Sequence, residues 1–374
     1  MPVNLAGAPV NLVPWQEKRY IHRMRQTYSL LTRSLTVLLL LVPLTTVFAS
    51  GAGEPIGDTT FDIGVFVPGV VDGSPTYEML VAGVQQAAGE VSDTSVAVIE
   101  GGFNQSTWEE GMMSMAAGGS YDLIVTSNPS MPEIAATVAE AVPDARFLIL
   151  DGYLPDHPQI HTILFNQQEQ AFLCGYFAGL VTTSAMPGVN DAARVGLLAG
   201  QEYPIMNEVI LPAYKMGVDA VASDGTVDFR VLGNWYDAGK AQEIVADMVA
   251  QGSDVVLTIA GGGNQGTISA ARERGVHVIW YDDAGYDEGP GVVAGSSFVR
   301  QDVATYEATR AAIRNELPFG TAQILGVADD AVSFDTEHPV FRENVPTAIG
   351  AEMNALLDRL KTGKLVLPLP IPGS

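Results

Sequence analysis

The chain has 374 residues, of which 47% are hydrophobic, so it is long enough for about two domains with buried cores. Its formal net charge is −24. Such an acidic surface repels phosphate groups and argues against a nucleic-acid-binding role.

The chain begins with a segment typical of an export signal. Residues 35–48, LTVLLLLVPLTTVF, form an apolar run that is too short for a comfortable membrane span. Basic residues precede it, and Val47 and Ala49 place small side chains at the −3 and −1 positions of a cleavage site. We therefore predict a signal peptide over residues 1–49, with Met24 as an alternative start. An uncleaved anchor is the alternative reading.

Export would change the charge and the compartment of the mature chain. The removed segment carries five basic residues and one acid, so the net charge becomes −28. We expect the mature protein to be periplasmic or associated with the cell envelope.

The first half of the mature chain alternates short apolar runs with helical patterns. Residues 61–69, FDIGVFVPG, predict a buried strand, and residues 77–88 predict a helix. Residues 121–153 then predict a strand, a turn, a helix and a second strand that ends at Asp151.

The second half repeats this order. A strand is predicted in residues 193–201 and a helix in residues 209–221, and residues 253–286 match the earlier unit with nearly equal lengths and end near Asp282. Continuous apolar strands that alternate with helices favour parallel sheets covered on both faces. The sequence therefore predicts an α/β protein of two similar lobes.

The single cysteine, Cys174, lies in the apolar helical stretch QAFLCGYFAG. One cysteine excludes an internal disulfide, so we predict a buried, inert thiol. The sequence contains no H-E-x-x-H motif, nucleophile elbow or P-loop, and we predict neither catalysis nor a metal site.

A G-x-G-x-x-G pattern on Gly261, Gly263 and Gly266 resembles a dinucleotide-binding fingerprint. The first copy of the repeat carries SNPSMP where the second carries GGGNQG, yet both copies keep an Asp at the end of a strand. Open α/β sheets bind ligands at this end of their strands. We therefore favour a small-molecule receptor without a cofactor. An NAD-dependent enzyme that uses the Gly261–Gly266 loop and Asp282 is the alternative.

Five stretches carry a family resemblance: VPDARFLILD, QAFLCGYFAGLVTTS, GNWYDAGKAQEIVADMVAQGSDVVLTIAGGG, IWYDD and GKLVLPLP. In this order they resemble the basic membrane protein (BMP) family, which comprises substrate-binding components of ABC transporters similar to purine-nucleoside receptors. The resemblance covers residues 61–368. It implies a two-lobed type I periplasmic-binding-protein fold, in which the chain crosses between the lobes three times.

The resemblance also implies lobe boundaries and a function. One lobe would hold residues 60–165 and 300–322, and the other residues 166–299 and 323–372. The protein would be a monomeric, extracytoplasmic substrate-binding protein of an ABC importer. It would bind a small polar ligand, expected to be a purine nucleoside, in the cleft between the lobes. Its partners would be an ABC permease and its ATPase. A chemosensory receptor with the same pocket is a further alternative.

Several ligand-binding residues follow from the same resemblance. Trp235 would stack on one face of the base, although a core position is its alternative. Asp151 would contact the base edge, and Asp282 would accept hydrogen bonds from the ribose hydroxyls. The backbone of Gly262 and Gly263 would approach the sugar. The position of a ribose-contacting basic residue is occupied here by Arg300.

The first binding loop, VVDGSPTYEMLVAG, departs from the family pattern. Asp72 and Ser74 are retained, whereas Pro75 and Thr76 replace a Phe-Asn pair. Tyr77 either supplies the second stacking face or simply begins the helix. Asn128, in the loop of the first repeat, completes the predicted ligand-binding set. This departure leaves other pentose-bearing or small polar ligands open.

Overall fold

The computed structural model describes residues 60–367. The predicted signal peptide, the alternative start at Met24 and residues 368–372 of the second predicted lobe lie outside the described residues. Within residues 60–367, no helix is both long and apolar enough to cross a membrane.

The first sheet has six strands in the order β11-β5-β4-β3-β1-β2, and every neighbouring pair is parallel. Its strands are β1 (Phe61–Val67), β2 (Thr94–Glu100), β3 (Leu123–Ser127), β4 (Phe147–Leu150), β5 (Ile160–Phe165) and β11 (Ala322–Leu325). Its helices are α2 (Pro75–Gly89), α3 (Trp108–Ala117), α4 (Met131–Ala141) and α9 (Gln301–Ile313), with the 3₁₀ turn η1 (Gln105–Thr107) before α3.

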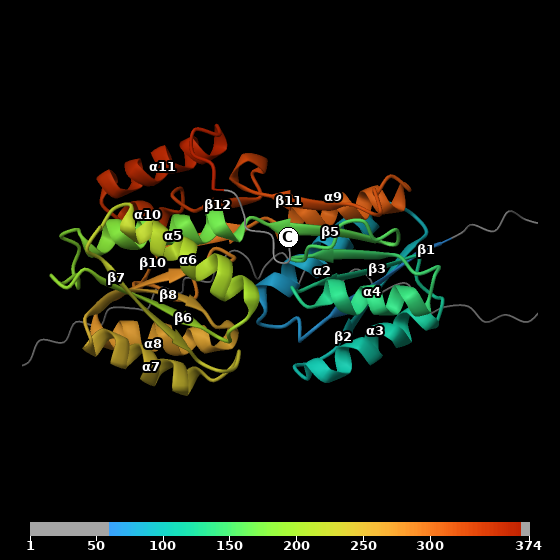
Figure 1. The fold of residues 1–374 in the computed structure, drawn as a ribbon, viewed down its shortest axis with the longest axis horizontal. Coiled ribbons are helices and arrows are strands. Elements are labelled where there is room, and N and C mark those ends of the chain that lie inside the picture. Colours follow the sequence, from blue (N-terminus) through green and yellow to red (C-terminus); the bar gives the residue numbers. More distant parts are fainter. Residues whose placement is uncertain (1–59, 368–374) are drawn as a thin grey trace, which may run out of the picture. The chain divides into compact units, whose positions relative to one another are not determined.

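Helices cover both faces of this sheet because side chains alternate along its strands. On β1, Ile63 and Val65 pack in the same apolar cluster as Leu80 of α2. Phe66 points to the other face and packs with Met112 of α3. Helix α9 contacts α2, and α4 contacts α3 (Figure 1).

The second sheet has the order β12-β10-β9-β8-β6-β7. Its strands are β6 (Arg194–Ala199), β7 (Thr226–Val231), β8 (Ser253–Ile259), β9 (His277–Trp280), β10 (Val293–Val299) and β12 (Val332–Phe334). Helices α5 (Gln167–Thr182) and α6 (Leu211–Asp219) contact each other, as do α7 (Ala238–Ala250) and α8 (Asn264–Arg274); each pair covers one face (Figure 1). The remaining elements are η2 (Met206–Ile210), η3 (Gly261–Gly263), η4 (Val327–Asp329), α10 (Pro339–Asn344) and α11 (Thr347–Lys361).

The two sheets have the same strand order, which confirms the internal duplication and the α/β class predicted from the sequence. The predicted repeats correspond to β3-α4-β4 and β8-α8-β9, and the strands within each repeat are parallel neighbours. Both sheets are predominantly parallel, as predicted, and β12 pairs antiparallel with β10 at the edge of the second sheet. The chain passes between the sheets after β5, after β10 and after β11.

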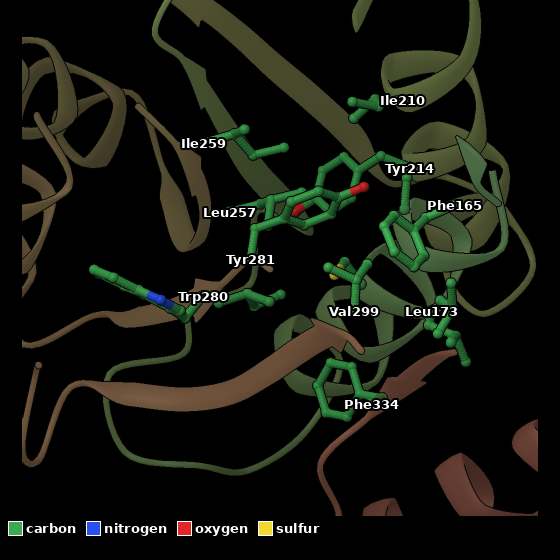
Figure 2. Close-up of a cluster of buried hydrophobic side chains, with 14 of the residues drawn as sticks. Phe165, Leu173, Ile210, Tyr214, Leu257, Ile259, Trp280, Tyr281, Val299 and Phe334 are labelled. Carbon is green, nitrogen blue, oxygen red and sulfur yellow. The ribbon is translucent and has the colours of Figure 1, made fainter. Parts of the chain in front are cut away.

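The second sheet and α5 share an apolar core (Figure 2). Cys174 of α5 is fully buried in it, and burial raises the pKa of its thiol to about 12. The prediction of a buried thiol is therefore confirmed. Phe177, one turn further along α5, packs against Phe334 of β12 with ring centroids 4.8 Å apart.

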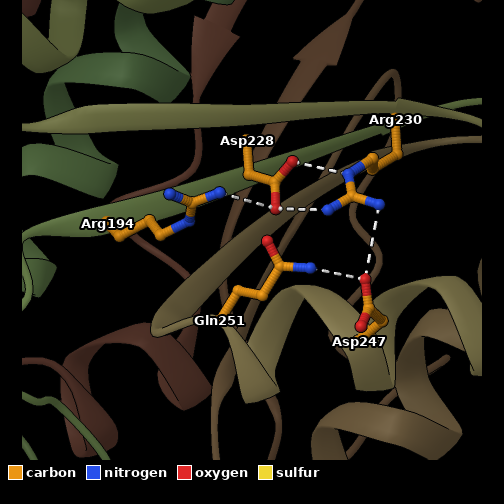
Figure 3. Close-up of polar contacts among 5 residues, drawn as sticks. All are labelled: Arg194, Asp228, Arg230, Asp247 and Gln251. Atoms are coloured by element: carbon orange, nitrogen blue, oxygen red, sulfur yellow. Dashed lines mark hydrogen bonds and ion pairs between the residues drawn. The ribbon is translucent and has the colours of Figure 1, made fainter.

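The edge of the second sheet carries an ion network (Figure 3). Asp228 on β7 accepts from Arg194 on β6 at 3.0 Å and from Arg230 at 2.6 Å. Arg230 also pairs with Asp247 of α7 at 3.4 Å. Burial alone would raise the pKa of Asp228, but the hydrogen bonds from the two guanidiniums outweigh burial and lower it. The network ties the edge strand β7 to β6 and α7.

Candidate functional site

One cavity lies where residues from both sheets converge. It has a volume of about 60 Å³. The lining comes from the ends of strands and from the first turns of α2, α5 and α9. It comprises Thr76, Asp151, Phe165, Gln167, Gln170, Tyr203, Ile259, Tyr281, Asp282, Val299 and Gln301.

Two aspartates carry the negative charge of this cavity. Asp151 follows β4 and Asp282 follows β9, which are equivalent strands of the two sheets. Both adopt a left-handed backbone conformation, with φ of 53° and 77°. Aspartate tolerates this conformation better than most residues. The chain therefore turns sharply after each strand and leaves the carboxylate at the strand's end.

Helix α5 supplies an amide to each carboxylate. Gln167 Nε2 donates to Asp151 Oδ1 at 2.6 Å, and Gln170 Nε2 donates to Asp282 Oδ1 at 3.2 Å. Residues three apart lie on the same face of a helix, so one turn serves both aspartates. Asn166 caps this turn by accepting from the backbone N–H of Glu169 at 3.2 Å.

The surroundings make both carboxylates reluctant to ionise. Burial raises the pKa of Asp151 to about 7; the negative charge of Asp282 adds to this rise and the hydrogen bond from Gln167 opposes it. Burial likewise raises the pKa of Asp282 to about 7, against the hydrogen bond from Gln170. Near neutral pH each carboxyl is therefore partly protonated.

A third glutamine joins the cavity to the first sheet. Gln301 begins α9, directly after the chain has left β10 of the second sheet, and is fully buried. Its Nε2 donates to the carbonyl oxygen of Thr76 at 2.7 Å, and its Oε1 accepts from Ser127 Oγ at 3.3 Å. These bonds fix the second crossing of the chain beside the cavity.

Among the described residues that line the cavity, none is lysine, arginine or histidine. The lining instead offers carboxylates, amides, hydroxyls and aromatic rings. A phosphate or carboxylate here would face two aspartates without a compensating cation. The site therefore suits a neutral polar ligand that donates hydrogen bonds.

Two of the ten ligand-binding residues predicted from the sequence, Asp151 and Asp282, line the cavity. The other eight lie outside its lining: Asp72, Ser74, Tyr77, Asn128, Trp235, Gly262, Gly263 and Arg300.

On the side of the first sheet, Tyr77 lies in the first turn of α2 beside the lining residue Thr76. Its hydroxyl donates to the carbonyl oxygen of Pro68 at 3.1 Å and accepts from Asn128 Nδ2 at 3.4 Å. Burial raises the pKa of Tyr77 to about 12. Asp72 is exposed in the preceding loop, whereas Ser74 is half-buried immediately before α2.

On the side of the second sheet, Trp235 packs over Gly200, where a Cβ atom would overlap its ring. Its ring centroid is 6.1 Å from that of Tyr203, which lines the cavity. Arg300 is exposed and pairs with Asp302 at 3.5 Å. Trp235 therefore lies behind Tyr203 and does not line the cavity. Arg300 does not line the cavity either, and its charge is paired with Asp302.

The glycine loop serves helix packing. A Cβ atom at Gly266 would overlap the carbonyl oxygen of Ala238, and one at Gly263 would lie 2.6 Å from Leu232 Cδ2. Gly266 lets α8 approach α7 closely, and Gly263 leaves room for the side chain of Leu232. Gly262 is exposed.

Sequence reasoning missed nine of the lining residues: Thr76, Phe165, Gln167, Gln170, Tyr203, Ile259, Tyr281, Val299 and Gln301. One signal was present for two of them, since Gln170 begins the predicted helical stretch QAFLCGYFAG and Gln167 precedes it by three residues. Tyr281 is adjacent to the predicted Asp282. The others lie at strand ends, in a loop or in first turns of helices that are far apart in sequence, and the sequence carries no comparable signal for them.

Comparisons with known proteins agree with this architecture. A family model, Bmp, described as ABC transporter substrate-binding protein PnrA-like, matches residues 61–365. The CD4+ T-cell-stimulating antigen of Listeria monocytogenes serovar 1/2a is 25% identical over 272 residues, which are 68% of this chain and 72% of that protein. The ABC transporter nucleoside-binding protein BmpA of Lactococcus lactis subsp. cremoris is 28% identical over 152 residues, 41% of each chain.

A solved structure shows the same fold. It is a solute-binding protein of an ABC transporter system from Aeropyrum pernix K1, with a TM-score of 0.73 and 20% identity. The match covers 84% of this chain and 94% of that one.

Proposed function

The chain belongs to the Bmp family of PnrA-like ABC transporter substrate-binding proteins, and from this membership we propose that it binds a purine nucleoside in the cavity described above and delivers it to an ABC importer. The nucleoside-binding name of the Lactococcus lactis relative supports this ligand class. The function requires binding and release without chemical turnover.

The observation that carries the proposal is the pair Asp151 and Asp282 facing one cavity that has no cation among its described lining residues. A nucleoside is neutral and presents ribose hydroxyls and base N–H groups as donors. Each carboxylate accepts such donors well. We propose that Asp151 contacts the base edge and that Asp282 contacts the ribose. The ring of Tyr203 would stack on a flat face of the base.

A nucleoside needs more room than this cavity has. Ligand pockets usually enclose about 300 Å³ or more, against about 60 Å³ here. Binding therefore requires the cleft to widen. We propose that residues 60–165 with 300–322 move as one lobe and residues 166–299 with 323–372 as the other, about the three chain crossings.

Widening also gives a role to predicted residues outside the present lining. Trp235 would add a second aromatic ring beside Tyr203, and Tyr77 with Asn128 would border the site on the side of the first sheet. We propose that Asp72, Ser74, Gly262, Gly263 and Arg300 form the outer rim of the opened cleft.

Calorimetric titration of the purified protein tests the ligand class. Adenosine, guanosine and inosine are compared with their 5′-monophosphates, with ribose and with NAD. We expect binding of at least one purine nucleoside and no binding of its monophosphate, because the added charge would meet two aspartates. Binding of NAD alone or of ribose alone would contradict the proposal.

Export and assembly complete the proposed function. Residues 1–49 would direct the chain out of the cytoplasm, and the mature monomer would present its ligand to a permease driven by an ATPase. A ligand-dependent stimulation of ATP hydrolysis by the reconstituted transporter would support this role over that of a chemosensory receptor.

A further inference from the structure

Two polar atoms of the cavity lining are buried and have no hydrogen-bond partner within residues 60–367. They are the side-chain oxygen Oε1 of Gln170 and the hydroxyl of Tyr281. Gln170 is fully buried and Tyr281 is 5% exposed. Buried polar atoms of folded proteins are nearly always hydrogen-bonded, so both atoms call for a partner.

The orientation of the Gln170 amide leaves its oxygen unpaired. Its Nε2 donates to Asp282 Oδ1 at 3.2 Å and to Ser297 Oγ at 3.3 Å. When Asp282 is ionised, turning the amide over would place Oε1 against its carboxylate, where two acceptors would meet. Oε1 is therefore held as an acceptor that awaits a donor.

The hydroxyl of Tyr281 is held as a donor. Its ring belongs to the same apolar cluster as Tyr214 and Phe165 (Figure 2). Burial, reinforced by the negative charge of Asp282, raises the pKa of Tyr281 well above its usual range. The hydroxyl consequently keeps its proton at neutral pH and can donate it.

We propose that Gln170 and Tyr281 determine specificity by hydrogen-bonding the ligand directly, Gln170 through Oε1 as an acceptor and Tyr281 through its hydroxyl as a donor. The nucleoside identity of the ligand rests on the proposed function. The ligand then offers donors to Asp151, Asp282 and Gln170 and an acceptor to Tyr281. A molecule that lacks one of these groups is rejected, because it leaves a buried polar atom unpaired.

The variant Tyr281→Phe tests this inference, since it removes one hydroxyl and preserves the ring. We measure the Kd of adenosine, guanosine and inosine, and the urea midpoint of the unliganded protein. We expect the Kd to rise at least tenfold while the urea midpoint does not fall. A purely structural tyrosine would lose stability.

Tyr214→Phe is the matched control. Tyr214 is fully buried in the same core, and its hydroxyl donates to the carbonyl oxygen of Gly196 at 3.1 Å. We expect this variant to show a lower urea midpoint and an unchanged Kd. Loss of the hydroxyl should thus weaken binding at Tyr281 and lower stability at Tyr214.

Gln170→Met provides a second variant that nearly preserves side-chain volume. We expect it also to weaken nucleoside binding at least tenfold. The inference is overturned if Tyr281→Phe and Gln170→Met both bind like the wild type. If the wild type binds none of these nucleosides, the proposed function is wrong. The urea midpoints then decide the inference, and a fall for Tyr281→Phe as large as that for Tyr214→Phe overturns it.

Discussion

Asp151 and Asp282 end equivalent strands of two different sheets, yet a single turn of α5 donates a hydrogen bond to each of them. Gln167 bonds Asp151 at 2.6 Å, and Gln170 bonds Asp282 at 3.2 Å. Helix α5 starts at the first crossing between the sheets, so its first turn lies between the two strand ends. The two halves of the internal repeat thereby contribute to one cavity.

Replacing either aspartate by asparagine should weaken ligand binding without lowering the stability of the protein. Hydrogen bonds to charged groups contribute about 1.5–3 kcal/mol, so we expect Asp151→Asn and Asp282→Asn each to raise the nucleoside Kd about 10- to 100-fold. The urea midpoint at pH 8 should not fall, because a neutral amide is easier to bury than a carboxylate. Titration calorimetry and urea unfolding give the two readouts.

The control for this pair is Asp224→Asn, an exposed aspartate in the turn before β7. It should change neither the nucleoside Kd nor the urea midpoint. Loss of binding in Asp224→Asn, or wild-type affinity in both cavity variants, would show that the aspartates are not the ligand contacts.

The same two aspartates predict that affinity depends on pH. Their pKa values are raised by burial to about 7 from 3.8. A ligand that donates hydrogen bonds to carboxylates prefers them ionised, so binding should release protons. Affinity should therefore rise between pH 5 and 7, by at most about tenfold per pH unit for each group, and level off above pH 7. Calorimetry in buffers of different ionisation enthalpy measures the protons released.

The stability of the unliganded protein should follow the opposite trend. Between about pH 4 and pH 7 the folded state retains protons that the unfolded chain has already lost. The contribution of these two groups to the free energy of unfolding therefore falls as pH rises through this window. Asp151→Asn and Asp282→Asn should each flatten both profiles, and a wild-type affinity that rises towards low pH would contradict the assignment.

Gly266 should be essential for packing. A Cβ atom there would overlap the backbone of α7, so we expect Gly266→Ala to lower the free energy of unfolding by about 3 kcal/mol, the upper end of ordinary overpacking costs. Urea unfolding measures this loss. At Gly89, at the end of α2, a Cβ atom meets no neighbour within 4 Å. Gly89→Ala should therefore be neutral or stabilising. A Gly266→Ala protein of normal stability would contradict the packing role of Gly266.

The ion network on β7 should stabilise the second sheet more than exposed ion pairs do. The Asp228 side chain is 6% exposed and binds two arginines. We expect Asp228→Asn to cost about 2 kcal/mol of unfolding free energy, because charged hydrogen bonds are lost and two guanidiniums are left without their partner. The comparison is Glu337→Gln, which breaks the exposed pair with Arg342 and should cost less than about 0.5 kcal/mol. Equal losses in the two variants would refute this ranking.

Local patterns along the chain specify the architecture of this protein. Runs such as FDIGVFVPG and ARVGLLAGQ, each followed by a helical pattern, are local signals, and they correctly predicted the strands and helices that build two similar α/β sheets. The repeat also identified Asp151 and Asp282, because the end of a strand is a position that the chain itself specifies.

Which other side chains share a cavity with those aspartates depends on long-range packing. Gln170 and Gln301 reach it because the crossings after β5 and β10 bring the first turns of α5 and α9 together, a relationship between segments distant in sequence. The role of Gly266 in the G-x-G-x-x-G pattern also became clear only from packing, because α7 occupies the space next to its Cα atom. Long-range packing leaves no periodic trace in a single chain, so the other polar residues that line the cavity can be identified only from the fold.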